Sequence, residues 1–322
     1  MAFSWDKVKR PILALAPMEG YTDSAFRQLV KEYAPDVICF TEFTSADALK
    51  YNSKKSIGKI GFSKAEKPLI VQLFGKHPDH FVEAIKYVED MGADGIDINM
   101  GCPAKNVINS QHGSALLKNP DLACEIVESV SLNTKLPVSV KMRIGFKEYD
   151  EKAFINFCIN LEKNGAKALT IHGRTTKQGY TGKADWNPVY KLKEKVGITV
   201  IGNGDVVSPK IAMDKRKNLD GVMVGRATFG NPLLMREIYE ALHPKSKKLK
   251  KQPDWFEIAK KHIILSVETK GEKKAMLEMR KHLAAYIKGF PYAAKYRSSL
   301  VRVETQKEAI NLLKEIKENS LK

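Results

Sequence analysis

A single cysteine at the end of a predicted strand is the first residue in this sequence that could do chemistry. Residues 94–106 read DGIDINMGCPAKN, in which Ile96 and Ile98 alternate with polar residues in the two-residue period of a strand. Pro103 then breaks the run and disfavours helical dihedrals at Cys102. The Cys102 thiol is therefore expected on an extended loop just past the strand, although a lone cysteine is more often a packing residue.

The four cysteines give no sign of a metal site or of a disulfide framework. They are Cys39, Cys102, Cys124 and Cys158, which are far apart and form neither a CxxC pair nor a Cys/His metal spacing. We therefore expect free thiols in a reducing cytoplasm and no bound metal. No secretory segment precedes Asp6 and no apolar run approaches the ~20 residues that span a bilayer, so we expect a soluble protein without a membrane partner.

The positive charge is concentrated toward the C-terminus. The formal net charge is +17, and residues 246–322 contain 19 Lys and Arg against 9 Asp and Glu. This surplus indicates a polyanionic partner, and nucleic acid fits best because no amphipathic membrane anchor is obvious. A solvated, lysine-rich surface is the alternative interpretation.

Eight strand-like segments recur through the first 245 residues, with room for a helix after each. They begin near residues 12, 37, 69, 95, 138, 168, 199 and 220, and helical patterns such as 78–91 and 151–164 lie between them. Mostly apolar strands that alternate with helices indicate a parallel sheet covered by helices. Eight such units predict a closed (β/α)₈ TIM barrel over residues 1–245. An open doubly wound sheet is the alternative, but no G-x-G-x-x-G follows the first strand.

In a TIM barrel the chemistry gathers at the C-terminal ends of the strands. Polar or small residues lie in or just after seven of the predicted strands: Met18, Gln72, Asn99, Cys102, Lys141, Arg143, His172, Arg174, Asn203, Gly204, Asp205, Gly225 and Arg226. A polar cap would explain any one of them. Together they predict one functional rim.

The last two predicted strands end in the glycine-rich loops IGNGDVVSP and VMVGRATFGNP. Bare backbone amides at Gly204 and Gly225, with the charge of Arg226, suit a phosphate-bearing cofactor, whereas tight turns are the alternative. Lys141 could stabilise negative charge beside N1 and O2 of a reduced flavin, or act as a Schiff-base lysine in a pyridoxal or aldolase barrel. The lack of an acid partner for a Schiff base, and the otherwise unused thiol, favour the flavin.

Nine motifs follow one another along the chain: APMEGYTD (16–23), VQLFG (71–75), DINMGCPAKNV (97–107), GSALL (113–117), VKMRIG (140–145), TIHGRT (170–175), NGD (203–205), MVGRATFGNP (223–232) and MRKHLAAY (279–286). In this order they resemble the tRNA-dihydrouridine synthase family, and its bacterial B-type members most closely. The resemblance implies an FMN-containing (β/α)₈ barrel and a C-terminal helical domain that together reduce uridine in folded tRNA with NADPH.

The resemblance also implies roles for individual residues. Cys102 matches the catalytic cysteine, and Asn99, Arg174 and Glu42 match substrate-side positions. The residues implied for FMN are Pro17, Met18, Glu19, Gln72, Lys141, His172, Asn203, Gly204, Asp205, Gly225 and Arg226. The stretch Glu19-Gly20-Tyr21 departs from the Ala-Gly and smaller residue of many members, which affects the expected shape of the pocket.

The implied reaction reduces the C5–C6 bond of uracil to dihydrouridine. Hydride passes from flavin N5 to C6, and a protonated Cys102 thiol is suited to give the proton to C5. Lys141 would lie at the N1/O2 side of the ring and Gln72 at its edge. Because the base must lie flat on the flavin, it has to leave its stack in the tRNA, and contacts elsewhere must compensate for this cost.

Residues 246–322 are predicted to supply those contacts as a basic helical tRNA-binding domain. A basic linker at 244–253 precedes helical patterns at about 254–270, 272–288 and 305–319, the last of which opens with a capping box from Thr305 to Glu308. The consecutive residues Arg280, Lys281 and His282 on the middle helix are expected to contact phosphate. A solvated helix face is the alternative for these three.

Two other functions stay open at this point. One is an FMN barrel that acts on a small pyrimidine, as dihydroorotate dehydrogenases do, and the basic tail argues against it. The other is an RNA-binding or RNA-folding module with secondary catalysis, against which the intact Cys102, Lys141 and rim argue. We expect a monomer. The sequence does not specify the tRNA position, a preference for NADPH over NADH, or activity on ribosomal RNA.

Overall fold

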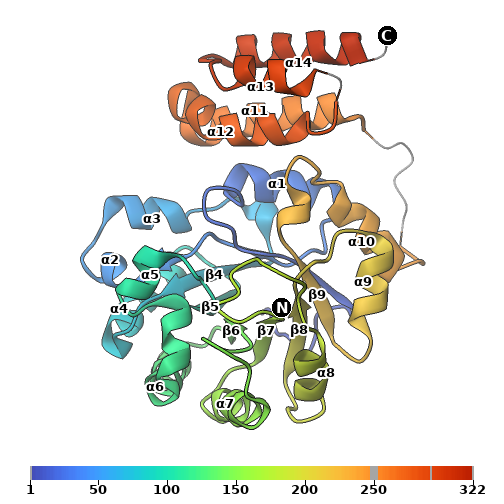
Figure 1. The fold of residues 1–322 in the computed structure, drawn as a ribbon. Coiled ribbons are helices and arrows are strands. Elements are labelled where there is room, and N and C mark those ends of the chain that lie inside the picture. Colours follow the sequence, from blue (N-terminus) through green and yellow to red (C-terminus); the bar gives the residue numbers. More distant parts are fainter. Residues whose placement is uncertain (1, 247–252, 291, 321–322) are drawn as a thin grey trace.

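The chain forms a closed barrel of parallel strands with a helical bundle packed on one side (Figure 1). The computed structural model describes residues 2–246, 253–290 and 292–320. The barrel strands are β1 (Ile12–Leu15), β2 (Cys39–Phe40), β4 (Leu69–Phe74), β5 (Gly95–Met100), β6 (Val138–Arg143), β7 (Ala168–His172), β8 (Thr199–Asn203) and β9 (Gly221–Val224). A two-residue strand, β3 (Thr44–Ser45), pairs with β4. The predicted TIM barrel is confirmed, and each barrel strand starts within two residues of its expected position.

The barrel closes between β1 and β2. The strand order is β1-β9-β8-β7-β6-β5-β4-β2, and every pair is parallel. Ala14 and Ile38 form the bridge that joins the two ends of this order. The amide of Leu15 donates to the Ile38 carbonyl at 2.9 Å, and the amide of Ile38 donates to the Leu13 carbonyl at 2.9 Å. This seam is short, because β2 has only two residues.

Helices cover the outside of the barrel. They are α1 (Ser24–Tyr33), α2 (Ala46–Lys50), α3 (Lys54–Ile60), α4 (Pro78–Asp90), α5 (Lys105–Asn109), α6 (Pro120–Leu132), α7 (Glu151–Lys163), α8 (Asn187–Lys193), α9 (Pro209–Arg216) and α10 (Leu234–Leu242), with short 3₁₀ turns η1 (Lys64–Glu66), η2 (Gly113–Lys118) and η3 (Arg226–Thr228). The patterns at 78–91 and 151–164 thus correspond to α4 and α7. Phe81, Ile85 and Val88 of α4 are buried at helical spacing, so this helix turns one apolar stripe to the sheet.

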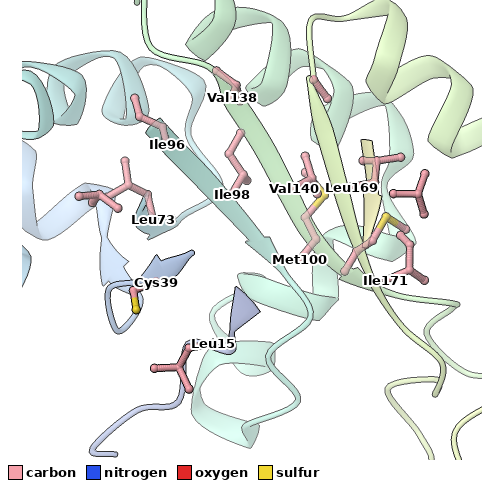
Figure 2. Packing of buried hydrophobic residues seen from close by; sticks show 14 of the residues in the cluster. Leu15, Cys39, Leu73, Ile96, Ile98, Met100, Val138, Val140, Leu169 and Ile171 are labelled. Carbon is pink, nitrogen blue, oxygen red and sulfur yellow. The ribbon is translucent and has the colours of Figure 1, made fainter. Parts of the chain in front are cut away.

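The two faces of each strand have different surroundings. Ile96 and Ile98 of β5 point outward and pack with Val140 and other apolar residues between the sheet and the helices (Figure 2). Asp97 and Asn99 alternate with them and therefore face the barrel interior. The interior is apolar around β1, β2, β8 and β9, where its cluster contains Trp5, Ile12, Ala14, Ile38, Phe40, Ile201 and Met223. Ile70 of β4 and Ala168 of β7 also belong to this cluster, but the buried residues that follow along β4 to β7 are polar: Gln72, Asp97, Ser139 and Thr170.

The C-terminal region is a four-helix unit with its own core. Its helices are α11 (Trp255–Lys270), α12 (Glu272–Tyr286), α13 (Ala293–Leu300) and α14 (Gln306–Ser320). The predicted capping box is present, because Glu308 N donates to Thr305 Oγ1 at 3.2 Å and Thr305 N donates to Glu308 Oε2 at 3.3 Å. The helix α13 was not predicted. Most of the expected basic linker, 247–252, lies outside the described residues.

The four-helix unit packs on α1 of the barrel (Figure 1). Phe26 and Val30 of α1 belong to the barrel core, whereas Leu29 and Tyr33 on its other side belong to the core of the C-terminal helices. Ion pairs join Lys270 to Asp23 and Lys261 to Glu32 across this contact. Within the described residues, no helix is long and apolar enough to cross a membrane.

Candidate active site

A cavity of about 910 Å³ opens at the C-terminal ends of the strands. The predicted site residues that line it are Pro17, Met18, Glu19, Asn99, Cys102, Lys141, His172, Asn203, Gly204, Asp205, Gly225 and Arg226. Most of the residues expected at the strand ends therefore border one cavity, and Gln72 and Arg174 are the exceptions. The volume of the cavity is in the range of pockets that enclose a cofactor or a small ligand.

The loop after β5 presents Cys102 to this cavity. Asn99 Oδ1 accepts hydrogen bonds from the amides of Gly101 at 3.1 Å and Cys102 at 3.0 Å, which turns the chain sharply at the strand end. The Cys102 carbonyl accepts from Ser114 Oγ at 2.8 Å, so the loop is held from both sides. Burial raises the pKa of the Cys102 thiol above its usual value. The thiol is therefore protonated at neutral pH and can act as an acid.

Gln72 lies behind this loop, inside the barrel, and does not line the cavity. Its side-chain oxygen accepts from Asn99 Nδ2 at 2.8 Å, and its Nε2 donates to Asp97 Oδ2 at 2.7 Å. Ser139 Oγ donates to the other oxygen of Asp97 at 2.6 Å. Asp97 was not among the predicted site residues, because its place in a strand gave no sign of this network.

Lys141 of β6 lies on the cavity wall beside Cys102. Burial, together with the neighbouring Arg143 charge, lowers the pKa of the Lys141 ammonium to about 8. Among the residues that the structure describes, this ammonium has no hydrogen-bond or ion-pair partner. A cation that is desolvated and unpaired favours an anionic ligand atom next to it.

A buried polar cluster around Arg174 lies behind the cavity wall that His172 and Asp205 form. The Arg174 guanidinium donates to both carboxylate oxygens of Asp205, at 2.9 and 2.8 Å, and approaches His172 Nε2 at 3.3 Å. Because arginine is only a donor, His172 Nε2 accepts and the ring carries its proton on Nδ1. Burial, with the nearby Lys141 charge, lowers the pKa of His172 to about 2, so the ring is neutral.

Arg174 and Glu42 do not reach the cavity, contrary to their predicted substrate-side roles. Arg174 is 2% exposed, its Nε donates to the Thr181 carbonyl, and the Nη2 that binds Asp205 also donates to the Gly182 carbonyl. Glu42 accepts a hydrogen bond from the Gly20 amide, and burial raises the pKa of its carboxyl group. Neither side chain lines the cavity, so both act in this structure as supports for the loops that do.

The glycine-rich loops after β8 and β9 bring backbone without side chains to the cavity wall. Gly204 has φ +124°, and a Cβ on it would come within 2.6 Å of Ala184 Cβ. A Cβ on Gly225 would meet nothing closer than Met18 Sδ at 3.4 Å. Arg226 adds a half-exposed guanidinium 3.6 Å from Asp205 Oδ1. This part of the wall can therefore receive a phosphate through bare backbone and one cation.

Several cavity residues were not predicted as site residues. Arg143 was expected at a strand end but without a role, and its Nε donates a hydrogen bond to the Gly101 carbonyl at 2.9 Å. Tyr180 lies in the loop after β7, where the Arg226 guanidinium stacks 4.3 Å from its ring centroid. Tyr21 and Phe229 stack at 3.8 Å between centroids at the rim. Loop aromatics carry no periodic signal, so the sequence could have indicated Tyr21 only through its departure from the family pattern.

The three consecutive basic residues of α12 have different surroundings. The Lys281 ammonium lies 5.1 Å from the centroid of Tyr21, so it reaches from the helical unit to the cavity rim. Arg280 is partly exposed. His282 is 2% exposed and packs against Phe26 and His262, and burial lowers its pKa well below the usual value. The predicted phosphate contact is therefore wrong for His282, which is buried and uncharged.

The fold and this cavity define a TIM-barrel enzyme. The family model described as Dihydrouridine synthase (Dus) matches residues 14–321. Probable tRNA-dihydrouridine synthase 1 of Synechocystis sp. is 37% identical over 303 residues, which cover 92% of this chain and 84% of that protein. tRNA-dihydrouridine synthase B of Xanthomonas campestris is 33% identical over 316 residues, which cover 95% and 92%. The chain belongs to the dihydrouridine synthase family.

A solved structure shares the barrel. The old yellow enzyme homologue from Zymomonas mobilis superposes with a TM-score of 0.55 at 15% identity, over 77% of this chain and 94% of that one. At this identity the likeness concerns the fold alone.

The residues of the cavity fit FMN. Lys141 offers an unpaired ammonium on the wall, where the ring of a reduced flavin would carry negative charge. Gly204 and Gly225 line the cavity with backbone that carries no side chain, and Arg226 lies beside them, where the phosphate would lie. Charge and space thus match the two ends of the cofactor.

Proposed function

We propose that this protein reduces specific uridines in tRNA to 5,6-dihydrouridine with bound FMN and a nicotinamide reductant, NADPH by preference and NADH as the alternative. The observation that carries the proposal is the meeting of a protonated Cys102 thiol and an unpaired Lys141 ammonium in one cavity. A flavin reduction of a C=C bond needs both an acid and a cation. Relatives named tRNA-dihydrouridine synthase support the choice of substrate.

When bound and reduced, FMN supplies the hydride that adds to C6 of uracil. Cys102 holds its proton on Sγ above the cavity and delivers it to C5, where negative charge develops. Lys141 stabilises the anionic edge of the cofactor, and Asn99 holds the Cys102 loop while its side chain borders the cavity. Gly204, Gly225 and Arg226 bind the phosphate. Burial of the thiol disfavours the thiolate, which is the form that could not act as an acid.

In this proposal the chain has two domains. Residues 1–245 form the catalytic barrel, and residues 246–322 form a helical domain that binds tRNA. The surplus of basic residues in the second part supports an RNA contact. Lys281, next to Tyr21 at the rim, lies where RNA entering the cavity would pass. The protein would act as a cytoplasmic monomer, without a metal, on a base flipped out of the folded RNA.

The decisive experiment is a visible absorption spectrum of the purified protein followed by anaerobic turnover. We expect flavin bands, bleaching on addition of NADPH, and recovery of the bands with unmodified tRNA but not with free uridine or orotate. A protein that cannot be loaded with FMN, or one that orotate reoxidises in preference to tRNA, would return the barrel to small-molecule chemistry.

A further inference from the structure

A chain of buried hydrogen bonds leads from the barrel interior to the backbone of Cys102. It begins at Asp97, which is fully buried and accepts from Ser139 Oγ at 2.6 Å and from Gln72 Nε2 at 2.7 Å. It continues from Asn99 Nδ2 to Gln72 Oε1 at 2.8 Å. It ends where Asn99 Oδ1 accepts from the amide of Cys102 at 3.0 Å. Every link lies within normal hydrogen-bond distance.

The carboxylate of Asp97 determines which group donates and which accepts in every hydrogen bond of this network. An ionised carboxylate accepts and cannot donate, so Gln72 must turn its NH₂ toward Asp97. The Gln72 oxygen then faces Asn99 and requires a donor there, which only the Asn99 NH₂ provides. Asn99 is left with its oxygen toward the loop, where the amides of Gly101 and Cys102 need an acceptor. Reversal of either side-chain amide would set two donors or two acceptors against each other.

At pH 7.5, where the experiment below is carried out, the Asp97 carboxyl group is ionised. Burial raises the pKa of its carboxyl group to about 6, while hydrogen bonds from Ser139 and Gln72 and the charge of Lys141 act against this rise. No Lys or Arg side chain forms an ion pair with Asp97 among the described residues. Burial of an unpaired carboxylate is unfavourable, and an apolar residue would pack in this position without that cost.

We propose that Asp97 is a positioning residue for the Cys102 thiol, acting through the side-chain amides of Gln72 and Asn99. The proposal rests on the proposed function, because it takes the Cys102 thiol as the proton donor. Asp97 itself does not line the cavity and touches neither the base nor the cofactor site. Its effect is to hold the two loop amides, and with them the direction of the Cys102 side chain.

Two substitutions at this position separate the positioning role from simple packing. Asp97→Leu removes the acceptor and frees both amides to turn. Asp97→Asn is the matched control, because its oxygen can still accept from Gln72 while Ser139 turns its hydroxyl to the Ile96 carbonyl, 3.4 Å away. The flavin content, the tRNA dissociation constant and the rate of flavin reduction by NADPH are measured for each variant. They report whether the barrel and its binding sites are intact.

The first readout is the rate at which iodoacetamide alkylates Cys102 at pH 7.5, followed by mass spectrometry of the Cys102 peptide. The second is the single-turnover rate at which tRNA reoxidises the reduced enzyme. For Asp97→Leu we expect at least a fivefold change in alkylation rate and a 10- to 100-fold slower reoxidation, with the tRNA dissociation constant within twofold of wild type. For Asp97→Asn, the alkylation rate and the reoxidation rate are both expected to stay within about threefold of the wild-type values.

An Asp97→Leu protein with full flavin content and wild-type rates on both readouts would overturn the proposal. If that variant does not fold, Asp97→Ser takes its place, since its hydroxyl is too short to reach Gln72, and the same criteria apply. Alkylation needs no RNA. A wild-type protein that fails to reduce tRNA would therefore overturn the proposed function, while the comparison of alkylation rates would still decide whether Asp97 positions the thiol.

Discussion

The Cys102 side chain combines exposure to a cavity with the properties of a buried group. Its backbone is fixed by Asn99 and Ser114, and burial keeps its proton in place by raising the pKa. A thiol with a lowered pKa would be a nucleophile, as in thiol proteases. Here the environment selects the opposite property, that of a weak acid, which is the property that the proposed proton donor needs.

Substitution of Cys102 by alanine should therefore slow one step and spare the others. We expect tRNA to reoxidise the reduced Cys102→Ala enzyme about 10²- to 10⁴-fold more slowly than wild type, because the general acid is lost. Flavin content and reduction by NADPH should not change. Stopped-flow absorbance of the flavin measures both half-reactions. Cys124→Ala, at a half-buried thiol on α6, is the control, and a wild-type reoxidation rate in Cys102→Ala would contradict this role.

Much of the cavity wall could be predicted from residue types at strand ends, because parallel strands bring those ends to one rim. Which of these side chains reach the cavity, and which stay behind its wall, could not be predicted. Gln72 and Arg174 face the predicted side of their strands or loops, yet hydrogen-bonded neighbours hold both behind the wall. Period-two alternation assigns a face, and only packing decides which residues on that face reach the ligand.

The loop after β8 is the element on which the cofactor end of the cavity depends. Gly204 has φ +124° and Asp205 has φ +54°, two successive residues in conformations that most side chains avoid. This strain is offset by three hydrogen bonds that the Asp205 carboxylate accepts, two from Arg174 and one from the Ala184 amide at 2.8 Å. The loop is thus held by these hydrogen bonds, and it has no room for a side chain at Gly204.

We therefore expect Gly204→Ala to weaken both the fold and FMN binding. Backbone strain alone should cost about 1–3 kcal/mol of the free energy of unfolding. The new methyl group would also come within 2.6 Å of Ala184 Cβ and 3.0 Å of His172 Cδ2. Denaturant unfolding and FMN titration measure the two effects. Gly179→Ala has a positive φ of +57° and open space, so it shows the effect of a milder positive-φ substitution without the clash.

The elements themselves were predictable where they are long and periodic. All eight barrel strands and the helices α11, α12 and α14 were expected. Strand β3 and helix α13 were not, because two residues in a strand and eight in a weakly amphipathic helix carry little pattern. Both form because tertiary contacts hold them, which no local window of sequence contains.

In the whole molecule, the contact between barrel and tail is built around buried histidines. His262 of α11 bonds Tyr286 Oη at 3.1 Å, and its ring centroid lies 4.6 Å from that of His282. Phe26 of α1 packs against both rings. Burial lowers the pKa of His262 to about 4, although the Asp23 carboxylate favours its charged form.

Acid should therefore loosen this contact. A histidine whose folded pKa lies below its unfolded value of about 6.5 lowers stability as pH falls through that value, since the unfolded chain binds the proton more readily. With a folded pKa of about 4, His262 should cost about 2 kcal/mol at pH 5 relative to pH 7.5. Thermal unfolding at the two pH values measures this, and His262→Phe should reduce the difference by about 2 kcal/mol, while His282 and His172, whose pKa values burial also lowers, keep the rest of it. An unchanged difference in that variant would assign the effect to other groups.

The placement of α1 limits how freely the parts of this enzyme could be exchanged. This helix covers the short seam between β1 and β2 on one side and completes the core of the tail on the other. A barrel cut off before residue 246 would expose Leu29 and Tyr33 to water beside the single bridge that closes the barrel. Transplanting the tail of a relative, as a route to a different target uridine, would thus require its α1 surface to move with it.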